Sequence, residues 1–415
     1  MLEFHKKKSK NPSKTEPEKR IKDFQEIYSQ FDKNDSVEQS SRCSQCGIPY
    51  CQIHCPLNNN IPDWLRYIAE GRLEEAYQVS ASTNAFPEVC GRVCPQDRLC
   101  EGNCVVEQAG FGAITIGNLE KYLTEIAWEK GWVKNLSSQN QYKQKVAIIG
   151  SGPAGMAASA YLIQNGYKVD VYEKNDRAGG LMIYGIPNFK LDKKIVERRT
   201  EWLTDSGVVF NLNTEVGKNI SFQDLEKDYD AILIATGVYK ARQLDIDTST
   251  VNNSIPALDF LIESNRTGLG DSPSKNKYLT AKDKHVVVIG GGDTAMDCVR
   301  TAIRQQAKEV TCLYRRNKEN MPGSAREVLN AEQEGIKFNW LSVPSKIISD
   351  SATATSMTYK VATLGEVDES GRRKPIDTGV EKQIKSDLII QALGFEPEDL
   401  NHNFKTNIEL TSWKT

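Results

Sequence analysis

Lys145-Val-Ala-Ile-Ile-Gly-Ser-Gly-Pro-Ala-Gly155 is the stretch of sequence that decides the fold. Its apolar, β-branched run predicts a strand, and the alanine-rich segment after the glycines predicts a helix. Gly150, Gly152 and Gly155 form a G-x-G-x-x-G turn, in which glycine lets the backbone approach a pyrophosphate at the helix N-terminus. The next strand ends in Glu173, a carboxylate that can accept hydrogen bonds from ribose hydroxyls. The alternative is a glycine-rich turn that only packs a helix on a strand.

The same pattern occurs a second time. The first copy closes near residues 230–237, whereas the second opens with His285-Val-Val-Val-Ile-Gly-Gly-Gly-Asp-Thr-Ala295 and closes near residues 387–394. Two units that each begin strand–glycine turn–helix predict two doubly wound α/β domains.

The second copy differs from the first at the end of its next strand. Arg315 and Arg316 stand there in place of an acid. A carboxylate would repel a 2′-phosphate, whereas guanidinium groups bind phosphate through two hydrogen bonds. The first copy is therefore predicted to bind FAD and the second NADPH. The alternative is that the two arginines only cover the surface.

Eight of the ten cysteines lie in two short clusters ahead of the first glycine turn. The clusters are Cys43-x2-Cys46-x4-Cys51-x3-Cys55 and Cys90-x3-Cys94-x5-Cys100-x3-Cys104. A proline follows Cys55 and another follows Cys94, as in ferredoxin-type sequences. These spacings favour iron–sulfur centres over structural zinc, because zinc sites usually pair two ligand couples across a longer loop. A non-catalytic module stabilised by metal is the alternative from another functional class.

Glu120 is an unexpected carboxylate within an apolar helix stripe. Ile116, Leu119, Glu120 and Leu123 lie at positions i, i+3, i+4 and i+7. A buried charge is costly unless it is paired or bound to a metal. Pattern alone leaves two interpretations open, a salt bridge or a ligand of a cluster.

Composition and charge exclude several classes of protein. The chain has 415 residues and a net charge of −2, so nothing in its charge balance requires nucleic acid. The sequence contains no apolar run of eighteen residues and no signal-peptide pattern, so no membrane association is expected. Cysteines gathered in one segment favour metal binding in a reducing compartment, and hence the cytoplasm. Residues 1–20 are rich in lysine and are expected to form a basic flexible tail.

With these features assembled, the chain resembles the family of small (β) subunits of NADPH-dependent glutamate synthase, a module shared with the N-terminus of dihydropyrimidine dehydrogenase. The stretches that carry the resemblance are 90–95, 116–120, 179–187, 290–297 and 314–323. The resemblance implies an oxidoreductase subunit that takes hydride from NADPH onto FAD. Electrons would then pass through two [4Fe–4S] clusters to a large partner subunit that forms glutamate. The alternative within this class is a subunit that serves ferredoxin or another partner enzyme.

The resemblance also implies the site residues. One cluster would be held by Cys43, Cys46, Cys51 and Cys104, and the other by Cys55, Cys94, Cys100 and Glu120, which leaves Cys90 free. Hydride transfer needs no general acid–base pair, and no catalytic residue is nominated. The residues expected to bind FAD are Gly150, Gly152, Pro153, Ala154, Gly155, Glu173, Lys174, Gly180, Leu181, Thr236 and Gly237. Those expected to bind NADPH are Gly290, Gly292, Asp293, Thr294, Ala295, Arg315 and Arg316.

The expected domains follow this order of motifs. After the tail, residues 21–140 form a helical [4Fe–4S] domain. Residues 141–265 and 386–415 form the FAD-binding domain, and residues 266–385 form the NADPH-binding domain. The FAD-binding domain is expected to be incomplete at its C-terminal end, because no Gly-Asp segment follows Gly394.

Overall fold

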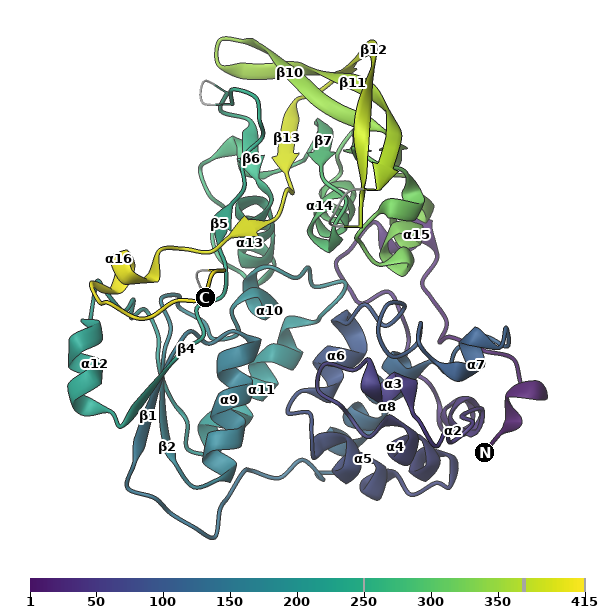
Figure 1. The fold of residues 1–415 in the computed structure, drawn as a ribbon, viewed down its shortest axis with the longest axis vertical. Coiled ribbons are helices and arrows are strands. Elements are labelled where there is room, and N and C mark those ends of the chain that lie inside the picture. Colours follow the sequence, from purple (N-terminus) through teal and green to yellow (C-terminus); the bar gives the residue numbers. More distant parts are fainter. Residues whose placement is uncertain (249–250, 368–370, 414–415) are drawn as a thin grey trace.

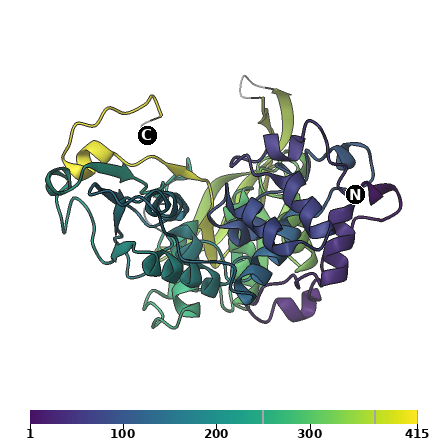
Figure 2. The same ribbon diagram turned by 90° about the horizontal axis from the view of Figure 1, so that it is seen from below.

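A computed structural model describes residues 1–248, 251–367 and 371–413 as three lobes (Figures 1 and 2). An N-terminal unit of helices is followed by a first and then a second nucleotide unit, each built on a parallel sheet. No helix in the described part of the chain is long and apolar enough to cross a membrane.

The N-terminal unit consists mainly of short helices. They are α1 (Pro17–Arg20), α2 (Lys33–Ser41), α3 (Tyr50–Ile53), α4 (Ile61–Ala69), α5 (Leu73–Ala81), α6 (Pro87–Val93), α7 (Val105–Gln108) and α8 (Ile116–Glu129). Trp64 and Leu65 of α4 pack with Leu119 and Leu123 of α8 in a core that also contains cysteine side chains. Helix α6 approaches α8 closely, because a Cβ atom on Gly91 would lie 2.6 Å from a carbonyl oxygen of α8.

The first nucleotide unit is a doubly wound domain. Its parallel sheet has the order β3-β2-β1-β4, with β1 (Lys145–Ile149), β2 (Lys168–Tyr172), β3 (Val209–Asn211) and β4 (Ala231–Ile234). Ile148 and Val171 pack on one face against α9 (Pro153–Gln164), α10 (Leu181–Tyr184) and α11 (Lys193–Asp205). Ala147 and Ile149 pack on the other face against α12 (Phe222–Asp228). Helices on both faces agree with the expected arrangement.

The second nucleotide unit has helices on only one face of its sheet. The parallel order is β6-β13-β7-β8-β9, with β6 (Ser254–Pro256), β7 (His285–Ile289), β8 (Glu309–Leu313), β9 (Lys337–Asn339) and β13 (Leu388–Gln391). Helices α13 (Ala257–Gly268), α14 (Asp293–Arg304) and α15 (Ala325–Gln333) cover one face.

An antiparallel sheet covers the other face. It contains β10 (Ser342–Asp350), β11 (Thr353–Val367) and β12 (Arg373–Lys385), and it stands at the top of Figure 1. Met357 and Tyr359 of β11 pack against Val287 and Ile389 of the parallel sheet. The second unit is therefore an α/β dinucleotide-binding fold in which an antiparallel sheet covers the face opposite the helices.

The sheets also divide the chain differently from the expected domain boundaries. Strands β6 and β13, which were expected in the FAD-binding domain, belong to the second sheet. The chain returns to the first unit only after β13, through β14 (Phe395–Glu396), which pairs with β5 (Lys240–Ala241). In α16 (Leu400–Phe404), Phe404 stacks on Phe222 with ring centroids 5.5 Å apart.

The N-terminal segment is packed against the molecule, in contrast to the flexible tail expected from its composition. The Leu2 amide donates to the Cys43 carbonyl at 3.0 Å, and Lys10 pairs with Asp35 at 2.8 Å. Arg20 is only 1% exposed, and its Nε lies 2.8 Å from a carboxylate oxygen of Glu334, the residue directly after α15. A basic composition did not reveal these partners, because they lie far away in sequence.

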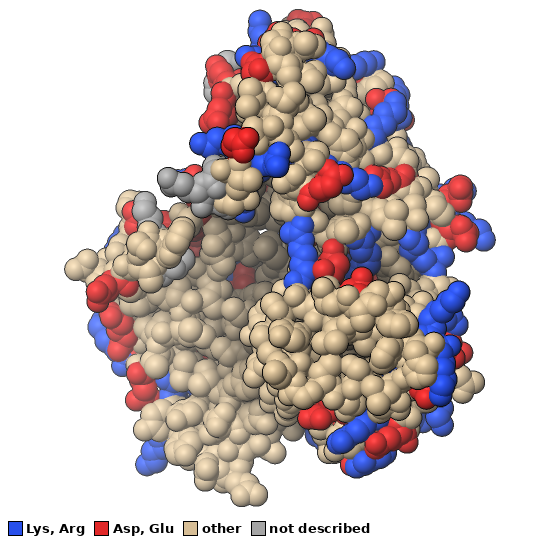
Figure 3. Space-filling view, turned by 45° about the vertical axis from the view of Figure 1, so that its right-hand side comes forward, with Lys and Arg blue, Asp and Glu red and all other residues tan. Residues whose placement is uncertain are grey.

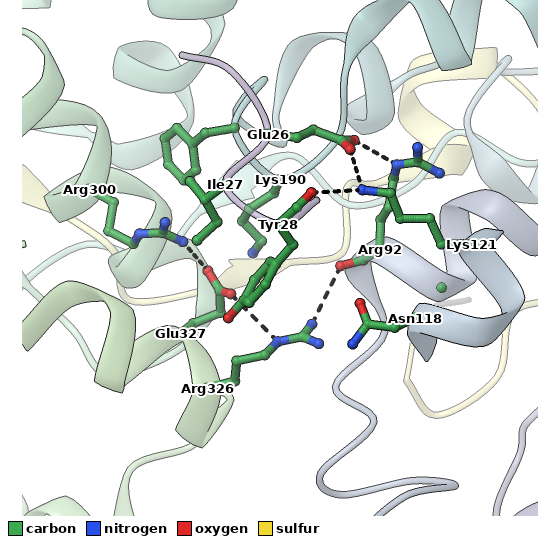
Figure 4. A pocket seen from close by; sticks show the side chains of 12 residues that line it. Glu26, Ile27, Tyr28, Arg92, Asn118, Lys121, Lys190, Arg300, Arg326 and Glu327 are labelled. Atoms are coloured by element: carbon green, nitrogen blue, oxygen red, sulfur yellow. Dashed lines mark hydrogen bonds and ion pairs between the residues drawn. The ribbon is translucent and has the colours of Figure 1, made fainter. Parts of the chain in front are cut away.

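All parts of the molecule meet at a charged junction. A hollow there is lined by residues from the N-terminal segment, the N-terminal unit and both nucleotide units (Figure 4). Arg300 pairs with Glu327 at 2.5 Å and with Glu334 at 2.8 Å, while Lys190 pairs with Asp297 at 2.8 Å. Buried ion pairs thus connect the first unit, the second unit and the N-terminal segment.

Candidate functional site

The first glycine turn lies between β1 and α9, and its three glycines have different surroundings. Gly150 has φ 105°, and a Cβ atom there would lie 2.5 Å from the Ala235 carbonyl oxygen. A Cβ atom on Gly155 would lie 2.0 Å from the Gly150 carbonyl oxygen. At Gly152, by contrast, a Cβ atom would have no neighbour within 4 Å. Packing therefore explains Gly150 and Gly155, whereas Gly152 leaves space where a ligand can approach the backbone.

Several of the residues expected to bind FAD gather around this turn. Pro153 and Ala154 are exposed at the start of α9, where backbone N–H groups favour an anion. A Cβ atom on Gly180 would lie 2.7 Å from the Gly152 Cα, so this loop touches the turn directly. Thr236 also contacts the turn, since its Cα would lie 3.2 Å from a Cβ atom on Gly150. Leu181 begins α10 directly after Gly180, and Gly237 follows Thr236.

Glu173 is buried at the end of β2 and is bonded to the protein itself. One carboxylate oxygen accepts from the Ser151 amide at 3.1 Å and from the Ser151 hydroxyl at 2.5 Å. The other oxygen accepts from the Asn175 amide at 2.9 Å and from the Asn175 side chain at 2.7 Å. Ser151 and Asn175, which were not predicted from the sequence, thus fix the orientation of Glu173.

Tyr239 is a further neighbour of the turn that was not predicted. Its ring carbon would lie 3.3 Å from a Cβ atom on Gly237, and Lys174 holds its ammonium group 4.7 Å from the ring centroid. Burial, followed by the nearby charges of Glu173 and Glu398, raises the pKa of Tyr239 to about 12. Tyr239 therefore forms one wall of the space around the first turn.

The second glycine turn, between β7 and α14, repeats this arrangement. A Cβ atom on Gly290 would lie 2.2 Å from the Ala392 carbonyl oxygen, whereas one on Gly292 would have no neighbour within 4 Å. Ala295, at the third position of the pattern, is completely buried in the core. Asp293 and Thr294 are half-buried at the start of α14, and Asp293 accepts a hydrogen bond from the Ser324 amide at 3.0 Å.

The two arginines after β8 have different environments. Arg315 is exposed beside the turn end of the strand. Arg316 is only 8% exposed, and its Nε donates to the Arg373 carbonyl of β12 at 2.8 Å. Arg315 is thus free to meet a phosphate in solution, whereas Arg316 anchors the antiparallel sheet.

Four cysteines from the two sequence clusters meet in the N-terminal unit. Cys43, Cys46, Cys51 and Cys104 all line a hollow between α3, α4 and the start of α7. Burial, followed by the nearby Cys43 and Cys104, raises the pKa of the Cys51 thiol to about 12. These four cysteines are the ones that the resemblance assigned to one cluster, and their role as its ligands stays a prediction.

Three members of the second expected set, Cys55, Cys100 and Glu120, lie near one another. Burial and then the charges of Glu101, Glu120 and Cys55 raise the pKa of the Cys100 thiol. Glu120 is 8% exposed and accepts from the Asn84 side chain at 3.1 Å. In the described part of the chain Glu120 forms no salt bridge, so the cation expected under the salt-bridge interpretation is not found there.

Cys90 lies beside the second set instead of apart from it. Its sulfur is 3.8 Å from the Asn84 side-chain oxygen, and a hydrogen bond with Cys94 is the largest cause of its raised thiol pKa. Among the described residues, no three His, Cys, Asp or Glu side chains are arranged to hold a single metal ion. A [4Fe–4S] cluster takes one ligand for each iron, so its ligands stand further apart, and a cysteine-lined hollow fits that requirement.

Comparison with known proteins agrees with this division of the chain. Residues 20–132 match the family described as dihydropyrimidine dehydrogenase domain II, 4Fe-4S cluster. Residues 144–415 match the family described as pyridine nucleotide-disulphide oxidoreductase. A structure of FprA from Mycobacterium tuberculosis in complex with NADPH is 20% identical, with a TM-score of 0.52 over 61% of this chain and 71% of FprA, and shows the same fold.

Two curated relatives extend over nearly the whole chain. The glutamate synthase (NADPH) small chain of Azospirillum brasilense is 51% identical over 100% of this chain and 87% of its own length. That of Escherichia coli strain K12 is 45% identical over 94% of this chain and 83% of its own length. The chain therefore belongs to the family of NADPH-dependent glutamate synthase small chains.

Proposed function

We propose that this chain is the NADPH-oxidising subunit of a glutamate synthase, which acts with a large partner chain in the cytoplasm. The second nucleotide unit binds NADPH, the first binds FAD, and the N-terminal unit holds two [4Fe–4S] clusters. The observation that carries the proposal is that one chain combines two glycine turns, each open at its second glycine, with a hollow lined by four cysteines.

The bound groups supply the redox chemistry: flavin accepts hydride from NADPH as an electron pair, and iron–sulfur clusters carry electrons singly. The protein binds and orients these groups. The N-termini of α9 and α14 would offer backbone N–H groups to the pyrophosphates, and Glu173, fixed by Ser151 and Asn175, would accept a hydrogen bond from the ribose of FAD. Arg315 distinguishes NADPH from NADH through the 2′-phosphate.

An exposed apolar surface on the N-terminal unit indicates where the large partner chain binds. Ile48, Ile53 and Leu57, on the segment that carries Cys46, Cys51 and Cys55, are 64%, 56% and 45% exposed. Exposed apolar side chains that gather in one place mark surfaces that bind other proteins. The front of the N-terminal unit also carries few charged side chains (Figure 3). We assign the large chain to the surface that carries Ile48, Ile53 and Leu57, so that electrons leave the molecule beside the first cysteine set.

Reconstitution with the large chain tests the proposal. The purified pair should oxidise NADPH and form glutamate only when both glutamine and 2-oxoglutarate are present. Each chain alone should form no glutamate from NADPH. An active NADPH–ferredoxin reductase that forms no glutamate with the large chain would favour the alternative function as an electron-transfer subunit for another partner.

A further inference from the structure

The loop between Cys94 and Cys100 of the N-terminal unit reaches the second nucleotide unit. Asp97 accepts from the Ser324 hydroxyl at 3.0 Å and from the Ala325 amide at 2.9 Å. The guanidinium of Arg98 donates to the carbonyl of Met321 at 2.7 Å and to that of Gly323 at 3.2 Å. Four hydrogen bonds therefore join this loop to residues 321–325.

Residues 321–325 in turn lie against the second glycine turn. The Gly323 amide donates to the Gly291 carbonyl at 2.8 Å, and the Ser324 amide donates to Asp293 at 3.0 Å. A Cβ atom on Gly323 would lie 3.1 Å from the Gly291 carbonyl oxygen, so the two backbones are in close contact. A shift of residues 321–325 would therefore also displace the second glycine turn.

The loop that carries Asp97 and Arg98 is itself firmly held. A Cβ atom on Gly102 would lie 1.9 Å from the Asp97 carbonyl oxygen, and the Gly102 amide donates to Gln96 at 3.0 Å. Asp97 also caps the N-terminus of α15, because the side chain of the N-cap residue Ser324 makes no capping hydrogen bond. A carboxylate at this helix N-terminus interacts favourably with the helix dipole.

We propose that Asp97 and Arg98 are positioning residues for NADPH, which hold residues 321–325 against the nucleotide turn from the iron–sulfur unit. The inference rests on the proposed binding of NADPH at Gly290–Ala295. In this arrangement the N-terminal iron–sulfur unit, which receives the electrons, also shapes the NADPH site of the second nucleotide unit. Neither residue is expected to contact the 2′-phosphate, so each substitution should weaken the binding of NADP⁺ and of NAD⁺ equally.

The test is titration calorimetry of NADP⁺ and NAD⁺ on the full-length protein with its iron bound. Asp97→Ala and Arg98→Ala should each weaken the binding of both nucleotides by about 5-fold, the effect of losing roughly one net hydrogen bond. In both variants the affinity for NADP⁺ relative to that for NAD⁺ should stay constant, whereas Arg315→Ala should lower this ratio. Ser324→Ala, which removes only the partner hydroxyl, should weaken both in the same direction. Glu129→Ala and Lys130→Ala, at the exposed end of α8, are the matched controls and should bind as the wild type does.

Two results would overturn the inference while leaving the proposed function intact. One is unchanged affinity of Asp97→Ala and Arg98→Ala for both nucleotides. The other is a loss of affinity that always accompanies loss of iron, since this would place the two residues in cluster assembly. A wild-type protein that binds neither nucleotide would instead refute the proposed function, and the inference with it.

Discussion

At the scale of single residues, the neighbouring Arg315 and Arg316 should differ in their effects. Arg315→Ala should raise the KM for NADPH by about 10- to 100-fold, because a hydrogen-bonded contact between charged groups is lost, and should leave the KM for NADH unchanged. Arg316→Ala should lower stability through its lost bond to Arg373 but keep the preference for NADPH. Steady-state kinetics with both nucleotides measure this difference. An unchanged NADPH preference in Arg315→Ala would contradict the role of this residue.

Glu120 permits a second test at the same scale. If Glu120 is a cluster ligand, Glu120→Ala should reduce the iron and sulfide content by about half, because one of two [4Fe–4S] clusters is lost. Cys90→Ser should retain all the iron, although Cys90 lies beside the same set. Iron analysis of anaerobically purified protein distinguishes the two variants. Full iron in Glu120→Ala, together with loss in Cys90→Ser, would reverse the assignment of these ligands.

At the scale of elements, two glycines of the first glycine turn should have different roles, one in folding and one in the binding of FAD. Gly152→Ala should fold normally but retain less FAD, because its added methyl group enters the open space where the pyrophosphate approaches. Gly155→Ala should unfold at lower temperature, because its methyl group would overlap the Gly150 carbonyl oxygen. Flavin absorbance and thermal unfolding of both variants measure the two effects. Equal flavin content in Gly152→Ala and the wild type would contradict the proposed site.

The exposed face on α3 carries the prediction about the partner chain. Ile53→Lys should weaken binding of the large chain by about 10-fold, because a charge would be placed in an apolar contact, while the iron content stays constant. Val209→Lys is the matched control, since Val209 is similarly exposed at 52% on the first nucleotide unit. Sedimentation of the mixed chains reports the affinity. If both variants bound equally well, the large chain would have to dock elsewhere.

At the scale of the whole molecule, the sequence predicted local features better than long-range contacts. The glycine turns and the two cysteine runs are each complete within about fifteen residues, so their patterns indicated the fold class. The crossed ligand sets, which join Cys43 to Cys104, were implied only by the resemblance to the family. The pairing of β6 with β13 and the contact of Arg20 with Glu334 join residues more than a hundred positions apart. Short strands and a basic segment contain no local signal for such partners, which explains why the domain boundaries and the N-terminal segment differed from expectation.

The buried charges at the junction determine how the assembled molecule should respond to acid. Burial raises the pKa of Glu334, but hydrogen bonds and charges from Arg304 and Arg300 outweigh it and lower the pKa to about 2, against an ordinary value of 4.5. A carboxyl group with a lowered pKa stabilises the fold at pH values above 4.5, and this stabilisation is lost as the pH falls towards 2.

Glu334→Gln should therefore lose about 3–5 kcal/mol of stability at pH 7, because Arg20, Arg300 and Arg304 are left buried without their common partner. The variant should also lose less stability than the wild type between pH 4.5 and 3. Glu332→Gln, in the last turn of α15, breaks only the surface pair with Lys318 and should cost less than about 1 kcal/mol. Thermal unfolding across this pH range compares the two. Similar losses in both variants would show that the junction does not depend on Glu334.

Faster hydrogen exchange of residues 14–28 in Glu334→Gln would show that Glu334 holds the N-terminal segment in place, because Arg20 joins that segment to α15.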